Sequence, residues 1–273
     1  MAVKVDSKVI RLKRCKPAAA GSVSKIRKDS SAEGSGEEEM IGYLFRKRRK
    51  RVLIDINTQK DFFRQGSDLC VRNPAGILSH IRRMVAWARH EGIPVISICE
   101  VSNGNGNSRA AYDCLKVSEG RKKTKYTLLG NHIVFPADDS THFPPDILRR
   151  HRQIILHNRG SDPFDEPRIE RMLGEMQVSE FVLIGAGAEG VVEATALGLL
   201  HRGKKVTVVV DAVGCQNKGK AKLALRKIKA KGAKLVATKK LAGVSHLKPV
   251  KNHSRQVCPE KGGEKPLEIG AGH

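Results

Sequence analysis

The chain has 273 residues, and its 40% hydrophobic content is enough to bury the core of one large α/β domain or two small ones. No run of about 18 or more apolar residues occurs, which excludes a membrane-spanning helix, and the first residues lack the apolar core of a secretory signal. We therefore expect a cytoplasmic protein. The six cysteines form no C-x-x-C pair and are expected to be reduced thiols.

The net charge of +23 is concentrated towards the two ends of the chain. Residues 1–51 carry 15 basic and 6 acidic side chains, residues 216–273 carry 15 and 3, and the segment between them carries 21 and 19. Cationic flanks attract RNA, DNA or acidic partners without reading bases. Non-specific contact of the tails with a polyanion or nucleic acid is therefore one function that the composition leaves open.

The sequence predicts one folded domain between two tails. Residues 1–44 are rich in Lys, Ser, Gly and Ala, which is typical of a disordered basic tail, and residues 243–273 predict a flexible basic tail. Over 45–242, short apolar runs alternate with segments of helical period. This pattern predicts a doubly wound, mostly parallel α/β sheet with helices on both faces.

The predicted sheet has six strands, near 52–57, 94–99, 153–157, 181–186, 205–211 and 234–237. The predicted helices cover roughly 74–91, 166–176, 190–202 and 218–231. In the last helix, Ala221, Ala224, Leu225 and Ile228 form one apolar stripe while lysines cover the remaining surface. The long basic stretch from 100 to 143 follows the carboxyl end of a strand, where α/β proteins build their sites.

The segment 182–213 contains a G-x-G-x-x-G pattern formed by Gly185, Gly187 and Gly190, between an apolar strand and a helix. This is the written form of a dinucleotide-binding fingerprint. In a dinucleotide fold the fingerprint belongs to the first strand–turn–helix unit, whereas here three strands precede it. We therefore interpret these glycines as a packing requirement of the turn, and we expect no cofactor.

Four segments in order resemble the isochorismatase-like cysteine hydrolases. "GAEGVVEATALGLLHRGKKVTVVVDAV" resembles the family segment in which a reactive cysteine begins the helix, and "NTQKDFF" resembles its D-x-Q-x-D-F-F strand end. "NRGSDPF" resembles its K-R-x-x-D-A-F segment, and "CLKVSEG" partly resembles its C-x-x-G-T-x-G loop. The resemblance implies this family's Rossmann-like fold and a homo-oligomer.

In the family, an aspartate and a lysine assist a cysteine at a helix N-terminus in hydrolysing small amides or carbamates, and some relatives without the cysteine cleave a vinyl ether. The resemblance places Asn57 at the aspartate position, Asn158 at the lysine position and Val191 at the cysteine position. The N–H groups of Gly190 and Val191 fall where the family binds an oxyanion. Neither asparagine transfers protons at neutral pH, and valine is not a nucleophile.

Three hypotheses follow. The first is a family member with lost or very weak hydrolase activity, whose crevice at most binds a small-molecule ligand. The second is an active hydrolase of a small amide, ester or ether that uses Asp55, two residues before Asn57 and on the same strand face, or a relocated thiol, Cys99 or Cys215. The third is a polyanion- or RNA-associated protein that acts through its basic tails. No metal site is indicated, because "CEVSN" lacks the histidines that some relatives use there.

Overall fold

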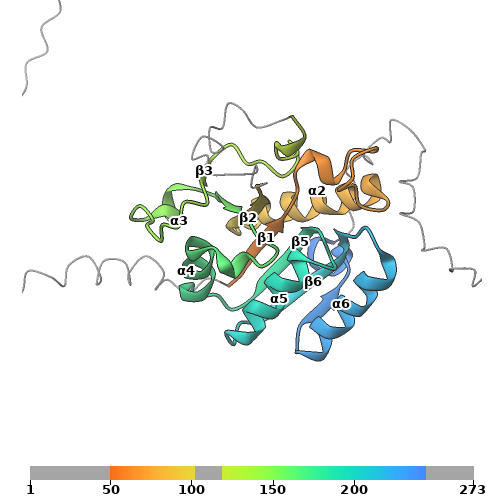
Figure 1. Cartoon of the computed structure of the whole chain (residues 1–273). Helices are drawn as coiled ribbons and strands as arrows, with labels where there is room; N and C mark the ends of the chain where they lie inside the picture. Colours follow the sequence, from red (N-terminus) through yellow and green to blue (C-terminus); the bar gives the residue numbers. More distant parts are fainter. Residues whose placement is uncertain (1–49, 102–118, 244–273) are drawn as a thin grey trace, which may run out of the picture. The chain divides into compact units, whose positions relative to one another are not determined.

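A computed structural model of the chain describes residues 50–101 and 119–243. Seven parallel strands form one sheet in the order β3-β4-β2-β1-β5-β6-β7 (Figure 1). From β1 the chain forms β2, then the edge strand β3 and then β4 between them, and it returns to β5 on the other side of β1. This reversal of direction is the signature of a doubly wound fold, and it confirms the predicted fold class.

The strands are β1 (Val52–Ile56), β2 (Val95–Glu100), β3 (His132–Phe135), β4 (Gln153–Asn158), β5 (Phe181–Ala186), β6 (Val206–Gly214) and β7 (Lys234–Val236). The α-helices are α2 (Pro74–His90), α3 (Ile147–Arg150), α4 (Pro167–Glu175), α5 (Val191–His201), α6 (Lys218–Ala230) and α7 (Thr238–Ala242). Within residues 50–101 and 119–243 there are also three short 3-10 helices: η1 (Lys60–Phe62), η3 (Glu119–Arg121) and η4 (Pro163–Asp165).

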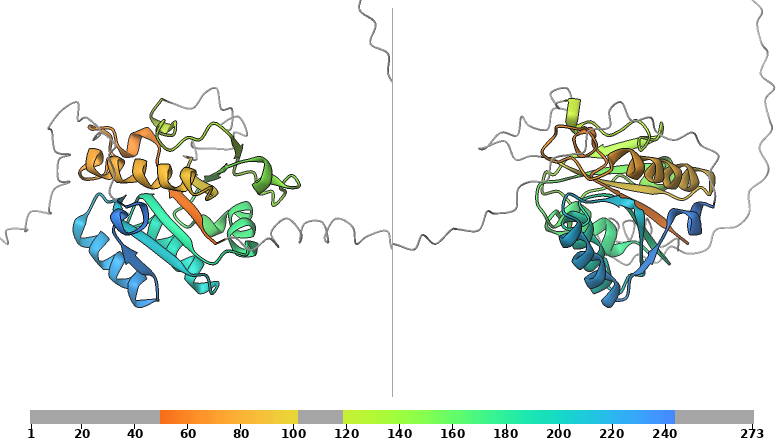
Figure 2. Two further views of the ribbon diagram at one scale, coloured as in Figure 1. Left: turned by 180° about the vertical axis from the view of Figure 1, so that it is seen from behind. Right: turned by 90° about the vertical axis from the view of Figure 1, so that its right-hand side faces the viewer.

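The sheet separates two hydrophobic cores, one on each face (Figures 1 and 2). On one face, α4, α5 and α6 pack on alternate strand residues such as Ile54 and Ile56. On the other face, α2 packs on the intervening residues, of which Leu53 and Val95 are examples. Because strand side chains alternate between faces, residues of one parity along β1 and β2 all face α2. The same alternation determines which polar side chains of β1 and β2 lie close together.

The structure adds elements that the sequence analysis omitted. The edge strand β3 and the short helices α3 and α7 were not predicted, so the sheet has seven strands where six were expected. β3 is only four residues long and half-exposed, so its sequence carries neither a buried apolar run nor a clear alternation. β6 continues three residues past Asp211, which itself accepts hydrogen bonds from the N–H and hydroxyl of Thr238 at the start of α7.

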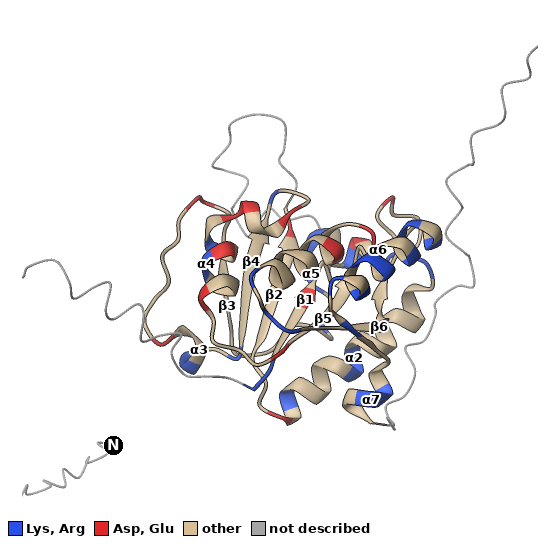
Figure 3. Cartoon of the chain, turned by 90° about the horizontal axis from the view of Figure 1, so that it is seen from below, with Lys and Arg blue, Asp and Glu red and all other residues tan. Residues whose placement is uncertain are grey.

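The predicted apolar stripe of the 218–231 helix is present in α6. Ala221, Ala224 and Ile228 are buried and Leu225 is partly buried, while the basic residues of the helix are exposed. Their positions along α6 are coloured blue in Figure 3. The predicted tail over 1–44 and nearly all of that over 243–273 lie outside the described residues, as do most of "CLKVSEG" and residues 45–49 of the predicted domain. No helix of the described part is long and apolar enough to cross a membrane.

Candidate functional site

The three positions singled out by the family resemblance lie at the carboxyl edge of the sheet. Asn57 directly follows β1, Asn158 ends β4, and Val191 is the first residue of α5, which follows the glycine turn after β5. β1 and β5 are neighbours at the point where the strand order reverses, and ligands of doubly wound folds bind outside this point. The fold therefore carries the three positions to one edge, although 101 residues separate Asn57 from Asn158.

Asn57 is turned towards Glu100, the last residue of β2. Its backbone has a φ of 49°, in the left-handed region that asparagine tolerates better than most residues, so the strand alternation ends at Ile56. The Asn57 Nδ2 donates to Glu100 Oε2 at 3.1 Å. Gln59 holds Glu100 in place, because its amide donates to the Glu100 carbonyl at 2.7 Å and accepts from the Glu100 N–H at 3.1 Å.

Asn158 joins the same group from the other side. It pairs in register with Glu100 across β2 and β4, and its Nδ2 donates to the Gly160 carbonyl at 2.7 Å. The two asparagines are buried, and their Oδ1 atoms have no hydrogen-bond partner among the described residues. The two amide oxygens and the Glu100 carboxylate thus offer acceptors at this edge. The two asparagine side chains contain no group that transfers a proton at neutral pH.

The start of α5 is fixed by contacts within its turn. The Gly190 N–H donates to the Gly187 carbonyl at 3.1 Å, which occupies one of the two N–H groups that the resemblance assigns to an oxyanion. Val191 is buried, and its carbonyl accepts from the Thr195 hydroxyl at 2.6 Å. A Glu189 oxygen accepts from the N–H groups of two residues that follow β6. The helix begins with an apolar side chain, Val191, at the position that the sequence resemblance assigns to the thiol of the family.

The first glycine of the turn serves the sheet. A Cβ on Gly185 would overlap the carbonyl oxygen of Ile56 on the neighbouring strand β1, and the φ of Gly185 is 132°. Only glycine fits such a close approach at this backbone conformation. This supports the packing interpretation for Gly185, whereas a Cβ on Gly187 or Gly190 would meet no atom closer than 3.8 Å, and Gly187 is required by its φ of 87°.

Asp55 lies on the opposite face of the sheet from Glu100. It shares the parity of Leu53, and its fully buried carboxylate accepts from Lys123 Nζ at 2.6 Å and from the Ser97 hydroxyl at 3.0 Å. The Lys123 ammonium also donates to the Thr58 hydroxyl at 2.7 Å, and 6% of the Lys123 side chain is exposed. The structure thus brings Asp55 into a buried ion pair and places Asn57 with Glu100 at the edge.

Cys99 belongs to the same side as this ion pair. It is buried, and burial raises the pKa of its thiol to about 11, although the nearby Lys123 ammonium lowers it and the Asp55 carboxylate raises it. With that pKa, about one thiol in 10⁴ is ionised at pH 7. Burial, followed by the Glu189 carboxylate, also raises the pKa of Cys215, which follows β6 beside the glycine turn. At both cysteines burial outweighs the nearby cations, Lys123 at Cys99 and Arg72 and Lys218 at Cys215, so neither thiol is activated.

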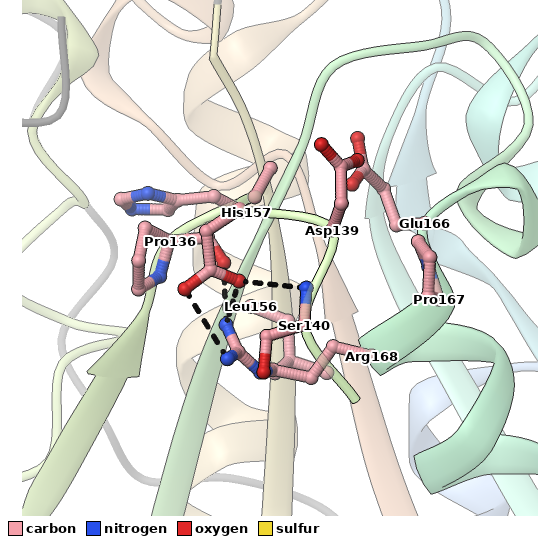
Figure 4. A pocket seen from close by; sticks show the side chains of 10 residues that line it. Pro136, Asp139, Ser140, Leu156, His157, Glu166, Pro167 and Arg168 are labelled. Carbon is pink, nitrogen blue, oxygen red and sulfur yellow. Dashed lines mark hydrogen bonds and ion pairs between the residues drawn. The ribbon is translucent and has the colours of Figure 1, made fainter. Parts of the chain in front are cut away.

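A small hollow lies farther along the edge, beside the carboxyl end of β4 (Figure 4). Its polar side chains pair with one another: Arg168 binds Asp138 and the Pro136 carbonyl, while Glu166 binds Arg159. His157 lines the hollow, and burial lowers the pKa of its imidazole, whose Nδ1 has no described partner. The charges here tie the 136–142 loop to the start of α4.

Two residues of this region were missed by the sequence analysis. Glu100 ends a buried strand at the expected edge, so its position alone was a usable signal. Lys123 lies in a basic stretch where three neighbouring residues are also cationic, and nothing in that pattern distinguishes the buried lysine from the exposed ones. Within the described residues, no group of three or more His, Cys, Asp or Glu side chains could hold a metal ion.

The strand order and the reversal at β1 and β5 define a doubly wound α/β protein, whose candidate site lies at the carboxyl edge of the sheet. More narrowly, the chain belongs to the isochorismatase family, because the family model for the Isochorismatase domain matches residues 51–240.

Solved structures agree with this assignment at the level of the fold. The chain is similar to the pyrazinamidase of Pyrococcus horikoshii in complex with zinc, with 20% identity over 69% of this chain and 99% of that one, and a TM-score of 0.52. It is also similar to a cysteine hydrolase from Pseudomonas syringae pv. phaseolicola, with 15% identity over 71% of this chain and 91% of that one, and a TM-score of 0.54. An isochorismatase-like hydrolase from Alkaliphilus metalliredigens is 16% identical over 73% of this chain and 99% of that one, with a TM-score of 0.53. No curated protein matches the sequence significantly.

Proposed function

We propose that this isochorismatase-family protein has lost the thiol hydrolysis of its relatives, or retains it only very weakly, and that its carboxyl edge at most binds a small ligand. One observation carries the proposal: α5 begins with a buried valine, Val191, at the point where the family presents its nucleophile. A thiolate at a helix N-terminus is stabilised by the helix dipole and by free N–H groups, and valine has no atom that can take this role.

The neighbouring groups support the same conclusion. A family-type reaction needs a carboxylate to accept the thiol proton and a cation beside it. Asn57 and Asn158 occupy those positions, and each uses its amide as a structural donor, to Glu100 and to Gly160 respectively. Because the unpaired atoms here are acceptors, a ligand of this edge would carry hydrogen-bond donors, such as an amide NH₂ or an amine.

A second candidate function rests on the cluster of Asp55, Lys123 and Cys99. It contains the acid, the cation and the thiol that an Asp–Lys–Cys hydrolase uses, assembled on the α2 side of the sheet. Burial of all three and the raised pKa of the thiol favour a structural role for the ion pair. The cluster therefore ranks below the lost-hydrolase proposal and is tested beside it.

The test is a turnover screen of the full chain against nicotinamide-like amides, carbamates, esters and isochorismate-like ethers. The wild type should show no turnover above background, and Val191→Cys alone should add little. The triple variant Asn57→Asp, Asn158→Lys, Val191→Cys should gain measurable amide hydrolysis, because triad members act as a unit. The matched control carries the same two changes with Val191→Ala, and it should remain inactive.

Other outcomes identify the alternatives. Wild-type turnover that is abolished by Cys99→Ser or Cys215→Ser, in a variant with an unchanged circular dichroism spectrum, would establish a relocated nucleophile and overturn the proposal. Turnover that depends on Asp55 but on neither cysteine would establish acid–base chemistry by that carboxylate.

A further inference from the structure

The outward side of α6 carries a concentration of positive charge within the folded domain. From 216 to 243 the chain has ten basic residues and no acidic one. The basic residues on α6 and at its C-terminal end are all exposed: Lys218, Lys220, Lys222, Arg226, Lys227, Lys229 and Lys231. We call these seven residues the α6 cationic face, and Figure 3 colours the Lys and Arg positions along the α6 ribbon blue. Among the described residues, only its Lys227 forms an ion pair, with Glu193 of α5.

The helical period divides this face into two rows. At about 100° per residue, Lys218, Lys222, Arg226 and Lys229 fall within about 80° on one flank of the buried stripe. On the other flank, Lys220, Lys227 and Lys231 fall within about 40°. The crest between the rows carries small or apolar residues, Gly219, Leu223 and Ala230, and Leu223 is 65% exposed. No aromatic side chain occurs on α6.

This arrangement opposes the stability of the helix. Lys222 is flanked at a spacing of four by Lys218 and Arg226, and like charges at this spacing destabilise a helix. The first turn contains no acidic residue and places lysines at the positive end of the helix dipole. Charges of alternating sign at this spacing would have stabilised the helix. The unpaired cations therefore indicate an anionic partner.

We infer that the α6 cationic face binds the phosphate backbone of double-helical DNA without reading its bases. A helix with its side chains is about 10–12 Å across, which fits the major groove of B-form DNA, about 12 Å wide, and places one row of cations along each strand. The major groove of A-form RNA is too narrow for this placement. Single strands are bound through aromatic stacking, which this face does not offer.

Other anionic partners fit the face less well. Insertion into a lipid surface needs several large apolar residues on the crest, and Leu223 is the single one there. Protein interfaces are enriched in aromatic residues, methionine and arginine and depleted in lysine, and of the enriched types α6 has only Arg226. The crest also lacks the Asn, Gln or Arg side chains that read base edges in the major groove. The expected binding is electrostatic and independent of sequence.

The test uses the full chain, fluorescence anisotropy and a labelled DNA duplex of about 20 base pairs over a range of salt concentrations. The variant Lys222→Gln, Arg226→Gln, Lys229→Gln keeps good helix formers and removes three charges. The control, Arg89→Gln, Lys125→Gln, Arg150→Gln, removes three exposed charges elsewhere. We expect the α6 variant to bind at least about tenfold more weakly and to lose about two to three units of the slope of log K against log salt, while the control loses little.

Three results would overturn the inference. The wild type fails to bind the duplex at low salt, the α6 variant and the control lose equal affinity, or the α6 variant binds as tightly as the wild type. Equal binding by the α6 variant would assign any polyanion contact to the basic tails. An RNA duplex, a DNA single strand and vesicles of anionic lipid serve as comparison ligands, and tighter binding of any one of them would replace double-helical DNA as the partner.

Discussion

The buried ion pair between Lys123 and Asp55 gives a sharp test of how the two faces of the sheet differ. Lys123→Met removes the cation and leaves a carboxylate with no exposed surface, which had accepted a 2.6 Å hydrogen bond from Nζ. Loss of one partner of a buried pair costs about 3–5 kcal/mol of unfolding free energy, because the remaining charge is uncompensated. For a domain of this size, that lowers the melting temperature by roughly 6–20 °C.

Urea unfolding at pH 7, followed by fluorescence of the single tryptophan, Trp87 in α2, measures this cost. The neighbouring variant Lys122→Met is the control, because 56% of that side chain is exposed and its pairing with Glu119 contributes under about 1 kcal/mol. Adding Asp55→Asn to Lys123→Met removes the unpaired buried carboxylate and should restore about 2 kcal/mol of unfolding free energy. If Lys123→Met and Lys122→Met lie within about 1 kcal/mol of each other, the ion pair does not hold the domain together, and its residues become stronger candidates for catalysis.

The pH range of this effect follows from the direction of the pKa shift of Lys123. Burial lowers the pKa, but the Asp55 carboxylate and the other nearby groups outweigh it, so the pKa is raised above its ordinary value of 10.5. The folded state therefore holds this proton more tightly than the unfolded state does. The corresponding stabilisation is fully present below pH 10.5 and is lost only as the pH rises through the folded-state pKa.

Three further predictions use other parts of the domain. Gly198→Ala in α5 should lower the free energy of unfolding in urea by about 1–3 kcal/mol, because the new Cβ overlaps the Phe164 ring. The control Gly174→Ala in α4 meets only ordinary contacts and should be neutral or stabilising. Equal effects of the two changes would refute the packing at Phe164. Burial lowers the pKa of His157, so the unfolded state binds its proton more readily, and the stability of the domain should fall as the pH drops below 6.5. His157→Gln should reduce this fall, whereas His90→Gln, at an exposed position, should not. The melting temperature between pH 7.5 and 5 measures both effects. Millimolar NAD or NADP should leave the melting temperature unchanged, since a ligand at 100 times its dissociation constant adds about 2.7 kcal/mol; a rise of several degrees would contradict the packing role of Gly185.

Local sequence patterns determined the elements with a strong period. Buried parallel strands appear as apolar runs, and sheet-packing helices repeat their apolar residues every three or four positions, so β1, β2, β4, β5 and α6 lie close to the predicted ranges. The same patterns set the order of the elements, and with it the edge at which Asn57, Asn158 and Val191 were expected. These features depend on neighbours within a few residues, which is why the sequence alone contains them.

Contacts between distant segments were decided by the tertiary structure. Lys123 meets Asp55 across 68 residues, and its sequence surroundings are those of an exposed lysine. The left-handed backbone of Asn57 turns its side chain to Glu100, so Asp55 and Asn57 serve different groups although a regular strand would put them on one face. A sequence pattern with a period of two assumes a regular strand backbone. It does not reveal where one residue leaves that conformation, or which distant side chain then lies within reach.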